Sequence, residues 1–186
     1  CKDLVRAPCA NACPAGVDVP TYVTLISEGK YAEALDVHRQ RNPFALACGR
    51  VCPAFCEHRC RRGELDQPVA IRQLKRFMAD HELKNPWTPE QTEAAKNKKV
   101  AVVGAGPAGL TAALRLAQWG YKVTVYEAAP VPGGWMALGI PEYRLPRDVL
   151  NAEIDNIRRA GVEIVCNRAL GKDFTIAGLR EQGFGA

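Results

Sequence analysis

The chain has 186 residues, which is enough for one large domain or two small ones. Its hydrophobic fraction of 47% and charged fraction of 24% are typical of a globular protein, and no apolar run approaches the roughly 20 residues that a membrane-spanning helix needs. The net charge of +5 is mild, and the basic cluster Arg59, Arg61 and Arg62 lacks the interleaved aromatic residues of a nucleic-acid surface. The composition therefore argues against membrane insertion and nucleic-acid binding.

Several short helices are predicted within residues 1–84. Asp18 followed by Pro20 is typical of a helix start, because an aspartate caps the first turn and a proline fits within it. A run over residues 31–41 has apolar residues at helical spacing, and residues 69–78 show the same pattern. The apolar positions expected on the buried face of this last helix are Val69, Leu74 and Phe77 or Met78.

Seven of the eight cysteines lie in the first third of the chain, and only Cys166 lies elsewhere. Clustered cysteines in an enzyme-sized chain are more typical of metal binding than of the disulfide framework of short secreted proteins. The segment 9–14 has the C-x3-C-P pattern that ends ferredoxin-type cluster motifs. The seven are Cys1, Cys9, Cys13, Cys48, Cys52, Cys56 and Cys60.

Four of these cysteines, from Cys48 to Cys60, stand at intervals of four residues. On one continuous helix they would spread over about 18 Å, too far for one compact cluster. Pro53 also disfavours such a helix. We therefore expect this run to bend or to serve more than one metal centre. We expect His58 to face solvent and Cys166 to be a buried small residue, not a redox thiol.

The composition changes near residue 84. Residues 1–84 form the predicted all-α cysteine-rich domain. The polar segment 85–97 is interpreted as a linker, in which Trp87 anchors the chain to one domain. Residues 98–186 form the predicted second domain, so the fold class expected is α+β with two domains.

The second domain shows alternating strand and helix patterns. Apolar runs at 100–103, 122–126 and 162–166 predict strands, whereas residues 110–119 and 148–160 have helical spacing. Because strands that alternate with helices are typical of a parallel sheet, we expect an α/β, Rossmann-like arrangement.

A glycine-rich motif, Gly104-Ala-Gly-Pro-Ala-Gly109, follows the first strand and opens the next helix. Gly104 permits the tight turn, Gly106 lets the backbone approach a pyrophosphate, and Gly109 lets the helix pack close to the strand. The helix amino-terminus offers unpaired N–H groups to phosphates. Glu127 ends the second strand, where a carboxylate that binds adenosine ribose hydroxyls is expected. The motif therefore predicts a dinucleotide site.

Together these motifs resemble the family of the glutamate synthase small subunit and dihydropyrimidine dehydrogenase. The resemblance covers essentially the whole chain, and it is carried by the order of the cysteine motifs, by residues 69–77 (VAIRQLKRF) and by residues 133–135 and 139–146 after the acid. In that family a helical domain with two 4Fe–4S clusters precedes an FAD-binding domain. The resemblance places FAD contacts at Val103, Gly104, Ala105, Gly106, Pro107, Gly109, Glu127, Gly133, Gly134, Trp135, Arg144 and Leu170. For Arg144 a surface salt bridge is the alternative.

The resemblance also assigns cluster ligands residue by residue. One cluster takes Cys1, Cys9 and Cys60, and the other takes Cys13, Cys52 and Cys56. Cys48 corresponds to a cysteine that need not be a ligand.

Two positions depart from the family pattern. Leu4 stands where the second cysteine of a C-x-x-C motif belongs, and Lys75 stands where the second cluster often has Gln or Glu. An ammonium group has no lone pair to donate to iron. The outcomes left open are two clusters with unidentified fourth ligands, recruitment of Cys48, a single cluster, and zinc or no metal.

By this resemblance the chain is part of a cytoplasmic NAD(P)H-dependent oxidoreductase that passes electrons between NAD(P)H, FAD and 4Fe–4S clusters. Its partner is a larger redox subunit or domain that carries the acceptor site, and NAD(P)H binds in a missing part of the protein. Because the sequence starts at Cys1 and stops at Ala186 within the flavin domain, we expect a fragment that is inactive alone. No catalytic acid, base or nucleophile is expected. The alternatives are a non-catalytic electron-transfer module that docks a larger complex, and a structural zinc module fused to a nucleotide-binding domain.

Overall fold

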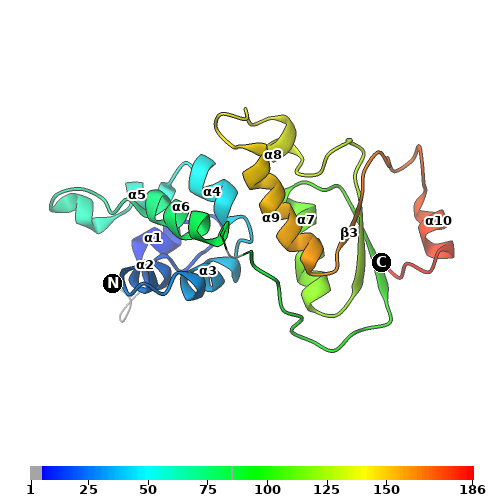
Figure 1. Ribbon diagram of the computed structural model, residues 1–186, viewed down its shortest axis with the longest axis horizontal. Coiled ribbons are helices and arrows are strands. Elements are labelled where there is room, and N and C mark those ends of the chain that lie inside the picture. Colours follow the sequence, from blue (N-terminus) through cyan, green and yellow to red (C-terminus); the bar gives the residue numbers. More distant parts are fainter. Residues whose placement is uncertain (1–5, 85) are drawn as a thin grey trace. The chain divides into compact units, whose positions relative to one another are not determined.

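A computed structural model describes residues 6–84 and 86–186. The chain divides into two compact units, Cys1–Asn85 and Pro86–Ala186, which are considered separately (Figure 1). The described part of the first unit is helical, and the second unit combines helices with a small parallel sheet. This helix-rich architecture agrees with the predicted α+β class. No helix within the described residues is long and apolar enough to cross a membrane.

The first unit packs short helices around a small core. Tyr22, Ala34, Leu46 and Met78 are among its buried residues. Its elements are α1 (Pro8–Ala12), α2 (Val19–Ser27), α3 (Tyr31–Arg39), α4 (Ala45–Val51), α5 (Phe55–His58), the 3₁₀ helix η1 (Arg61–Glu64) and α6 (Ile71–Glu82).

The start of α2 agrees with the predicted cap. One carboxylate oxygen of Asp18 accepts the backbone N–H of Thr21 at 3.2 Å, and the other accepts the Thr21 hydroxyl at 2.7 Å. Pro20 lies in the first turn, where its missing N–H costs nothing. The helix predicted over residues 31–41 is also present, but it ends at Arg39.

The segment between Cys48 and Cys60 bends, as expected. Helix α4 ends at Val51, Cys52 has extended backbone angles, and Ala54 has a left-handed conformation with φ of 58°. Helix α5 then begins at Phe55. The bend breaks the four-residue spacing that would otherwise place the thiols in a row along one helix.

The buried face of α6 differs from the predicted one. Val69 lies before the helix, and Phe77 is 53% exposed. The prediction was right for Met78, which is fully buried, but Val69 and Leu74 are only half-buried and Phe77 is exposed. The residues that α6 buries are Ile71, Lys75, Met78, Ala79 and Glu82.

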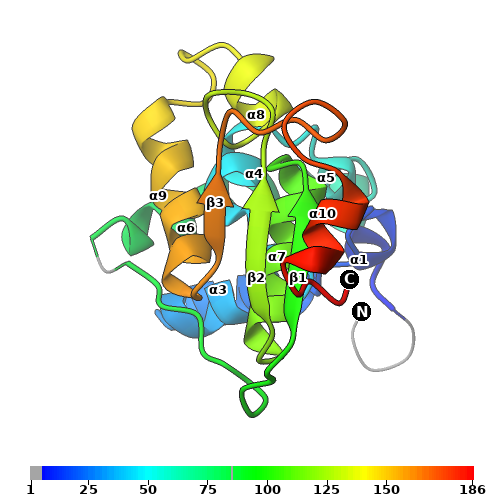
Figure 2. The same cartoon turned by 90° about the vertical axis from the view of Figure 1, so that its right-hand side faces the viewer.

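The second unit contains three parallel strands in the order β1-β2-β3. Figure 2 shows β2 between its neighbours, with α7 behind the sheet. Leu110, Leu114, Val125 and Ile154 are fully buried in its core. The elements are β1 (Lys99–Val103), α7 (Pro107–Gln118), β2 (Lys122–Tyr126), α8 (Trp135–Leu138), α9 (Arg147–Arg159), β3 (Glu163–Val165) and α10 (Ile176–Glu181).

The start of the second unit is held by backbone contacts. The carbonyl of Trp87 accepts Arg159 Nε at 3.0 Å, and the N–H of Thr92 donates to the carbonyl of Gln118 at 2.7 Å. The predicted anchor therefore acts through its backbone as well as through its half-buried ring. The register of the sheet places Val103 opposite Tyr126, so the glycine motif and Glu127 leave the sheet at the same edge.

Candidate functional site

Five of the six described cysteines of the first unit lie at or near the ends of its short helices, and Cys48 lies in the middle of α4. Cys9 is in α1 and Cys13 ends it, Cys52 follows α4, Cys56 is in α5, and Cys60 precedes η1. Each is a free, half-buried thiol. Cys1 and Leu4 lie outside the described residues. Helix ends leave the thiols partly accessible, as metal binding requires.

Three sulfur atoms already accept hydrogen bonds. The N–H of Ala54 donates to Cys52 Sγ at 3.4 Å, and the N–H of Val69 donates to Cys60 Sγ at 3.5 Å. Asn42 Nδ2 donates to Cys48 Sγ at 3.3 Å. Hydrogen bonds to cysteine sulfur stabilise the thiolate form and are one of the means by which proteins tune iron–sulfur clusters.

Burial and neighbouring charges raise the pKa of two of the thiols, Cys9 and Cys56. Burial raises the pKa of Cys9, and the negative charge of Cys60 adds to this rise. Burial raises the pKa of Cys56 to about 11; Lys75 opposes the rise, and Cys52 and Glu57 add to it. Because these thiols hold their protons in the metal-free protein, metal binding would release them.

Tyr22 lies among both groups of thiols. Its ring is buried, and burial raises the pKa of its hydroxyl, as do the charges of the four surrounding cysteines. The ring meets His38 edge-on, with centroids 6.1 Å apart. The Nδ1 atom of His38 has no hydrogen-bond partner in residues 6–84 and 86–186. The four cysteines are Cys56, Cys13, Cys9 and Cys52.

The thiols are too far apart to hold a single metal ion. Within the described chain, no three His, Cys, Asp or Glu side chains come close enough together for that. A cube of four irons is larger than one ion, so its ligands stand farther apart. The half-buried thiols, the N–H donors aimed at sulfur and the buried cation near Cys56 fit such a cluster.

In the second unit the glycine motif forms the turn from β1 into α7. Gly104 has φ of 99°, and Gly106 caps the helix. A Cβ at Gly109 would overlap the carbonyl oxygen of Gly104, so only glycine fits there. A Cβ at Gly106 would meet no atom within 4 Å. The open space before Gly106 therefore lies at the helix amino-terminus, where a phosphate group binds.

The Glu127 carboxylate accepts hydrogen bonds from two backbone N–H groups, one of which is in this loop. Its Oε2 accepts the N–H of Ala105 at 2.6 Å, and its Oε1 accepts the N–H of Ala129 at 2.8 Å. Each carboxylate oxygen has a second lone pair, which remains able to accept a hydroxyl. The structure thus brings together the glycine motif and the acid, which are separated by more than twenty residues in the sequence.

The double glycine packs directly against the motif. The N–H of Gly133 donates to the carbonyl of Ala105 at 2.8 Å. A Cβ at Gly134 would lie 2.9 Å from the Cα of Gly106, and Gly134 has φ of 52°. The segment that begins α8 therefore packs its backbone directly against the glycine loop. Pro107 is the first residue of α7 and is exposed beside this contact.

The remaining predicted contact residues lie on the surface. Val103 ends β1, Leu170 forms an isolated bridge with Phe174, and the Trp135 ring is 81% exposed. Arg144 is exposed and forms no ion pair with any described residue, so the alternative of a surface salt bridge is not observed.

Comparison with known proteins now identifies the first unit. Residues 1–87 match the family described as dihydropyrimidine dehydrogenase domain II, 4Fe–4S cluster. Residues 102–147 match the NAD(P)-binding Rossmann-like domain. The family resemblance inferred from the motifs is confirmed.

Three curated relatives are similar to this chain over nearly its whole length. It is 48% identical to NADP(+)-dependent formate dehydrogenase subunit beta of Moorella thermoacetica, over 94% of this chain and 28% of that protein. It is 46% identical to NADPH-Fe(3+) oxidoreductase subunit beta of Geobacter sulfurreducens, over 97% and 27%. It is 40% identical to NAD-dependent dihydropyrimidine dehydrogenase subunit PreT of Escherichia coli O157:H7, over 95% and 43%. The chain spans less than half the length of each.

Two residues of structural importance, Arg147 and Tyr22, were not singled out from the sequence. Arg147 donates to the backbone carbonyls of Met136 and Leu145 at 3.0 and 3.3 Å, and to that of Ile140 at 2.7 Å. It thereby holds the segment that carries Trp135 and Arg144. An arginine in the first turn of a helix gives no signal for this role. Tyr22 was missed too, because an aromatic residue at helical spacing is typical of any core.

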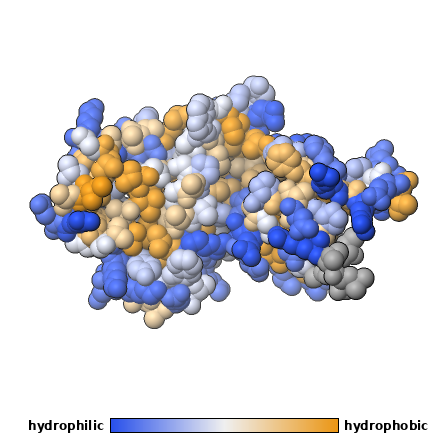
Figure 3. Space-filling view, turned by 180° about the vertical axis from the view of Figure 1, so that it is seen from behind, coloured by the Kyte–Doolittle hydropathy of each residue, from blue (hydrophilic) through white to orange (hydrophobic). Residues whose placement is uncertain are grey.

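Figure 3 shows apolar residues gathered in patches on one face of the molecule, with hydrophilic residues around them. In the second unit the 133–146 segment carries exposed large apolar residues, including Trp135 and Tyr143, the latter 86% exposed.

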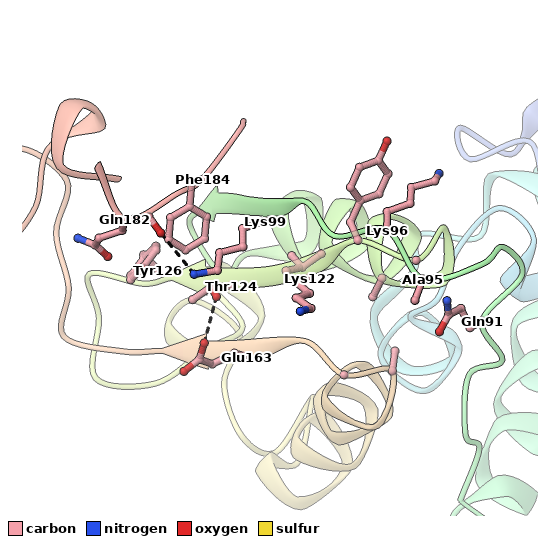
Figure 4. Close-up of a pocket in the computed structure, with 16 residues that line it drawn as sticks. Gln91, Ala95, Lys96, Lys99, Lys122, Thr124, Tyr126, Glu163, Gln182 and Phe184 are labelled. Atoms are coloured by element: carbon pink, nitrogen blue, oxygen red, sulfur yellow. Dashed lines mark hydrogen bonds between the residues drawn. The ribbon is translucent and has the colours of Figure 1, made fainter. Parts of the chain in front are cut away.

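A separate hollow of about 690 Å³ lies over the strands β1 and β2 (Figure 4). Lys99, Lys122, Tyr126, Glu163 and Phe184 line it. None of the predicted FAD contacts lines this hollow.

Two remaining expectations concern isolated residues. His58 is exposed, as expected. Cys166 is half-buried, so the expectation of a fully buried residue was wrong: the short strand β3 ends at Val165 and leaves it at the sheet edge.

Proposed function

We propose that this chain is the electron-transfer portion of a cytoplasmic NAD(P)H-dependent iron–sulfur flavoprotein. The first unit binds two 4Fe–4S clusters and the second begins the FAD-binding domain. The nicotinamide site belongs to a further part of the protein, and a larger redox subunit or domain carries the acceptor. A reducing compartment fits the free thiols of the described cysteines.

The observation that carries this proposal is the order of the two sites on one chain. Residues 1–87 match the family of 4Fe–4S domains named above. A glycine-rich loop of the dinucleotide-binding type follows at residues 104–109, and its Ala105 N–H donates to the carboxylate of Glu127. The curated relatives named above are subunits of NAD(P)-linked oxidoreductases by their printed names. A flavin can accept a hydride, which carries two electrons, from a nicotinamide and exchange single electrons with iron–sulfur clusters. The cofactors supply this chemistry, and the protein supplies position and potential.

For the clusters, the proposed ligands are Cys1, Cys9 and Cys60 for one and Cys13, Cys52 and Cys56 for the other. The mutual charge effects of Cys9 with Cys60, and of Cys52 with Cys56, support this grouping. Cys48 is held by Asn42 and remains a reserve ligand in this proposal.

For the flavin, the chain's residues have distinct tasks. The N–H groups at the start of α7 receive the pyrophosphate before Gly106, and Glu127 receives the ribose hydroxyls. The double glycine lets the next segment pass close to the nucleotide, and Arg147 holds that segment. The exposed Trp135 and Arg144 present an apolar ring and a cation toward the bound group. When bound, FAD supplies the two-electron to one-electron exchange.

The test is anaerobic purification of the intact protein, followed by iron, acid-labile sulfide and flavin analysis. We expect both iron and FAD, with absorption near 400 nm that bleaches with dithionite. A colourless protein that contains zinc would instead support the structural zinc module. Flavin reduction by NADPH or NADH separates an enzyme from a passive docking module, because only the former reacts with the nicotinamide.

A further inference from the structure

Helix α6 carries a cation in the middle of its buried face. Lys75 lies between Ile71 and Met78 on this face and is only 7% exposed. A charged group that leaves water loses a large hydration energy unless an opposite charge or hydrogen bonds compensate it. The fold must therefore supply a compensating charge to Lys75.

The other buried charges of the first unit are paired. Arg39 contacts Glu82, and Arg50 contacts Asp80 at 2.6 Å. In the part of the chain that the structure describes, the ammonium group of Lys75 forms no ion pair or side-chain hydrogen bond. The carboxylates nearest along α6 are thus engaged elsewhere, and no carboxylate among residues 6–84 pairs with Lys75.

Lys75 lies on the side of α6 that contacts the loop carrying Cys52 and Cys56. Arg72, one turn earlier on the same side of α6, donates Nη1 to the carbonyl of Cys52 at 3.0 Å and its N–H to Glu57 Oε1 at 2.7 Å. Glu57 is therefore also engaged. Because Lys75 lies three residues after Arg72 and is buried, its side chain leaves α6 on the same side as these contacts.

We propose that Lys75 is the fixed counter-charge of the cluster held by Cys13, Cys52 and Cys56, and that it raises the reduction potential of this cluster. The inference rests on the proposed function. An ammonium cannot ligate iron, so its effect is through space. Reduction adds negative charge to the cluster, and a cation in a low-dielectric interior stabilises that charge more than it would in water. Lys75 thus sets the reduction potential of the cluster through its charge and does not ligate iron.

The experiment compares the intact wild-type protein with Lys75→Met, Lys75→Arg and Lys84→Met. Methionine keeps the apolar stem without the charge, arginine keeps the charge, and Lys84 is an exposed lysine just after α6. Each protein is purified without oxygen, analysed for iron and sulfide, and titrated with dithionite while the clusters are followed by electron paramagnetic resonance. Dithionite donates one electron to each cluster, and no protein bond forms or breaks.

We expect Lys75→Met to lower the midpoint potential of one cluster and not of the other. The expected change is tenfold or more in the reduction equilibrium, which corresponds to about 59 mV for a one-electron couple. Lys75→Arg and Lys84→Met should retain the wild-type potentials. If Lys75→Met loses the iron of one cluster while Lys75→Arg keeps it, the counter-charge is also needed for assembly, and the proposal holds.

Two results would overturn the proposal. One is Lys75→Met with full iron content and unchanged potentials; the other is iron loss in both Lys75→Met and Lys75→Arg, which would assign a packing role to the lysine stem. Wild-type protein without iron would instead refute the proposed function itself, so the two failures are distinguishable.

Discussion

Two glycines of the nucleotide motif should respond differently to the same small change. At Gly109 an added methyl group would overlap the carbonyl oxygen of Gly104 and lie 3.1 Å from its carbonyl carbon. Both atoms belong to the backbone, so neither can rotate away. At Gly106 the methyl group would meet no atom within 4 Å, and φ there is −77°. The Gly106→Ala variant is therefore a matched control for Gly109→Ala.

The magnitudes follow from this contrast. Forcing a methyl group into a filled site costs about 1–3 kcal/mol. Gly109→Ala should therefore lower the melting temperature of the flavin-free domain, by about 2–4 °C for each kcal/mol. Gly106→Ala should change the stability by less than about 1 kcal/mol, the small cost of alanine at a helix cap. It should still weaken FAD binding at least tenfold, or about 1.4 kcal/mol, because the methyl group occupies the space before the helix amino-terminus.

The assay is thermal unfolding of the flavin-free intact protein, together with a fluorescence titration of FAD. The expected pattern is loss of stability in Gly109→Ala and loss of affinity without loss of stability in Gly106→Ala. Wild-type FAD affinity in Gly106→Ala would refute the placement of the pyrophosphate, and wild-type stability in Gly109→Ala would refute the close approach of helix and strand.

Three further predictions concern both units. Glu127→Ala should destabilise the flavin-free protein by about 1–3 kcal/mol, since two backbone N–H groups lose their acceptor, and Glu127→Gln should cost less; thermal unfolding compares them. Cys52→Ser should lower the iron content by one cluster, whereas Cys48→Ser should leave it unchanged; equal iron in both variants would contradict the ligand assignment. Burial, with the charges of Lys75 and Arg39, lowers the pKa of His38 from 6.5 to about 3. The unfolded chain therefore binds a proton below pH 6.5 that the folded chain does not, so acidification from pH 6.5 to 5.5 should cost about 1 kcal/mol of stability. The His38→Gln variant should show a flatter pH dependence in denaturant titrations, and identical slopes would count against the assignment.

Local signals in the sequence predicted the elements that depend on near neighbours. The Asp18 cap acts within three residues, and the glycine motif acts within six, so both could be found without the fold. The period of the apolar residues located β1, β2, α7 and α9 to within a few residues. It was less reliable for α6, where the buried face contains Lys75 and excludes Phe77.

The composition and spacing of this sequence alone determined its organisation: a cysteine-rich helical part, then a glycine loop and an acid on a parallel sheet. Only the tertiary structure decided which groups meet. It joined Glu127 to Ala105, brought Tyr22 within electrostatic reach of four thiols, and buried Lys75 on the side of α6 that contacts the Cys52–Cys56 loop. These contacts join residues distant in sequence, and they depend on how helices and strands pack. The spacing of residues along the chain shows only which of them share one face of a helix or strand. Whether that face is buried, and which charges lie near it, depends on the elements that pack against it.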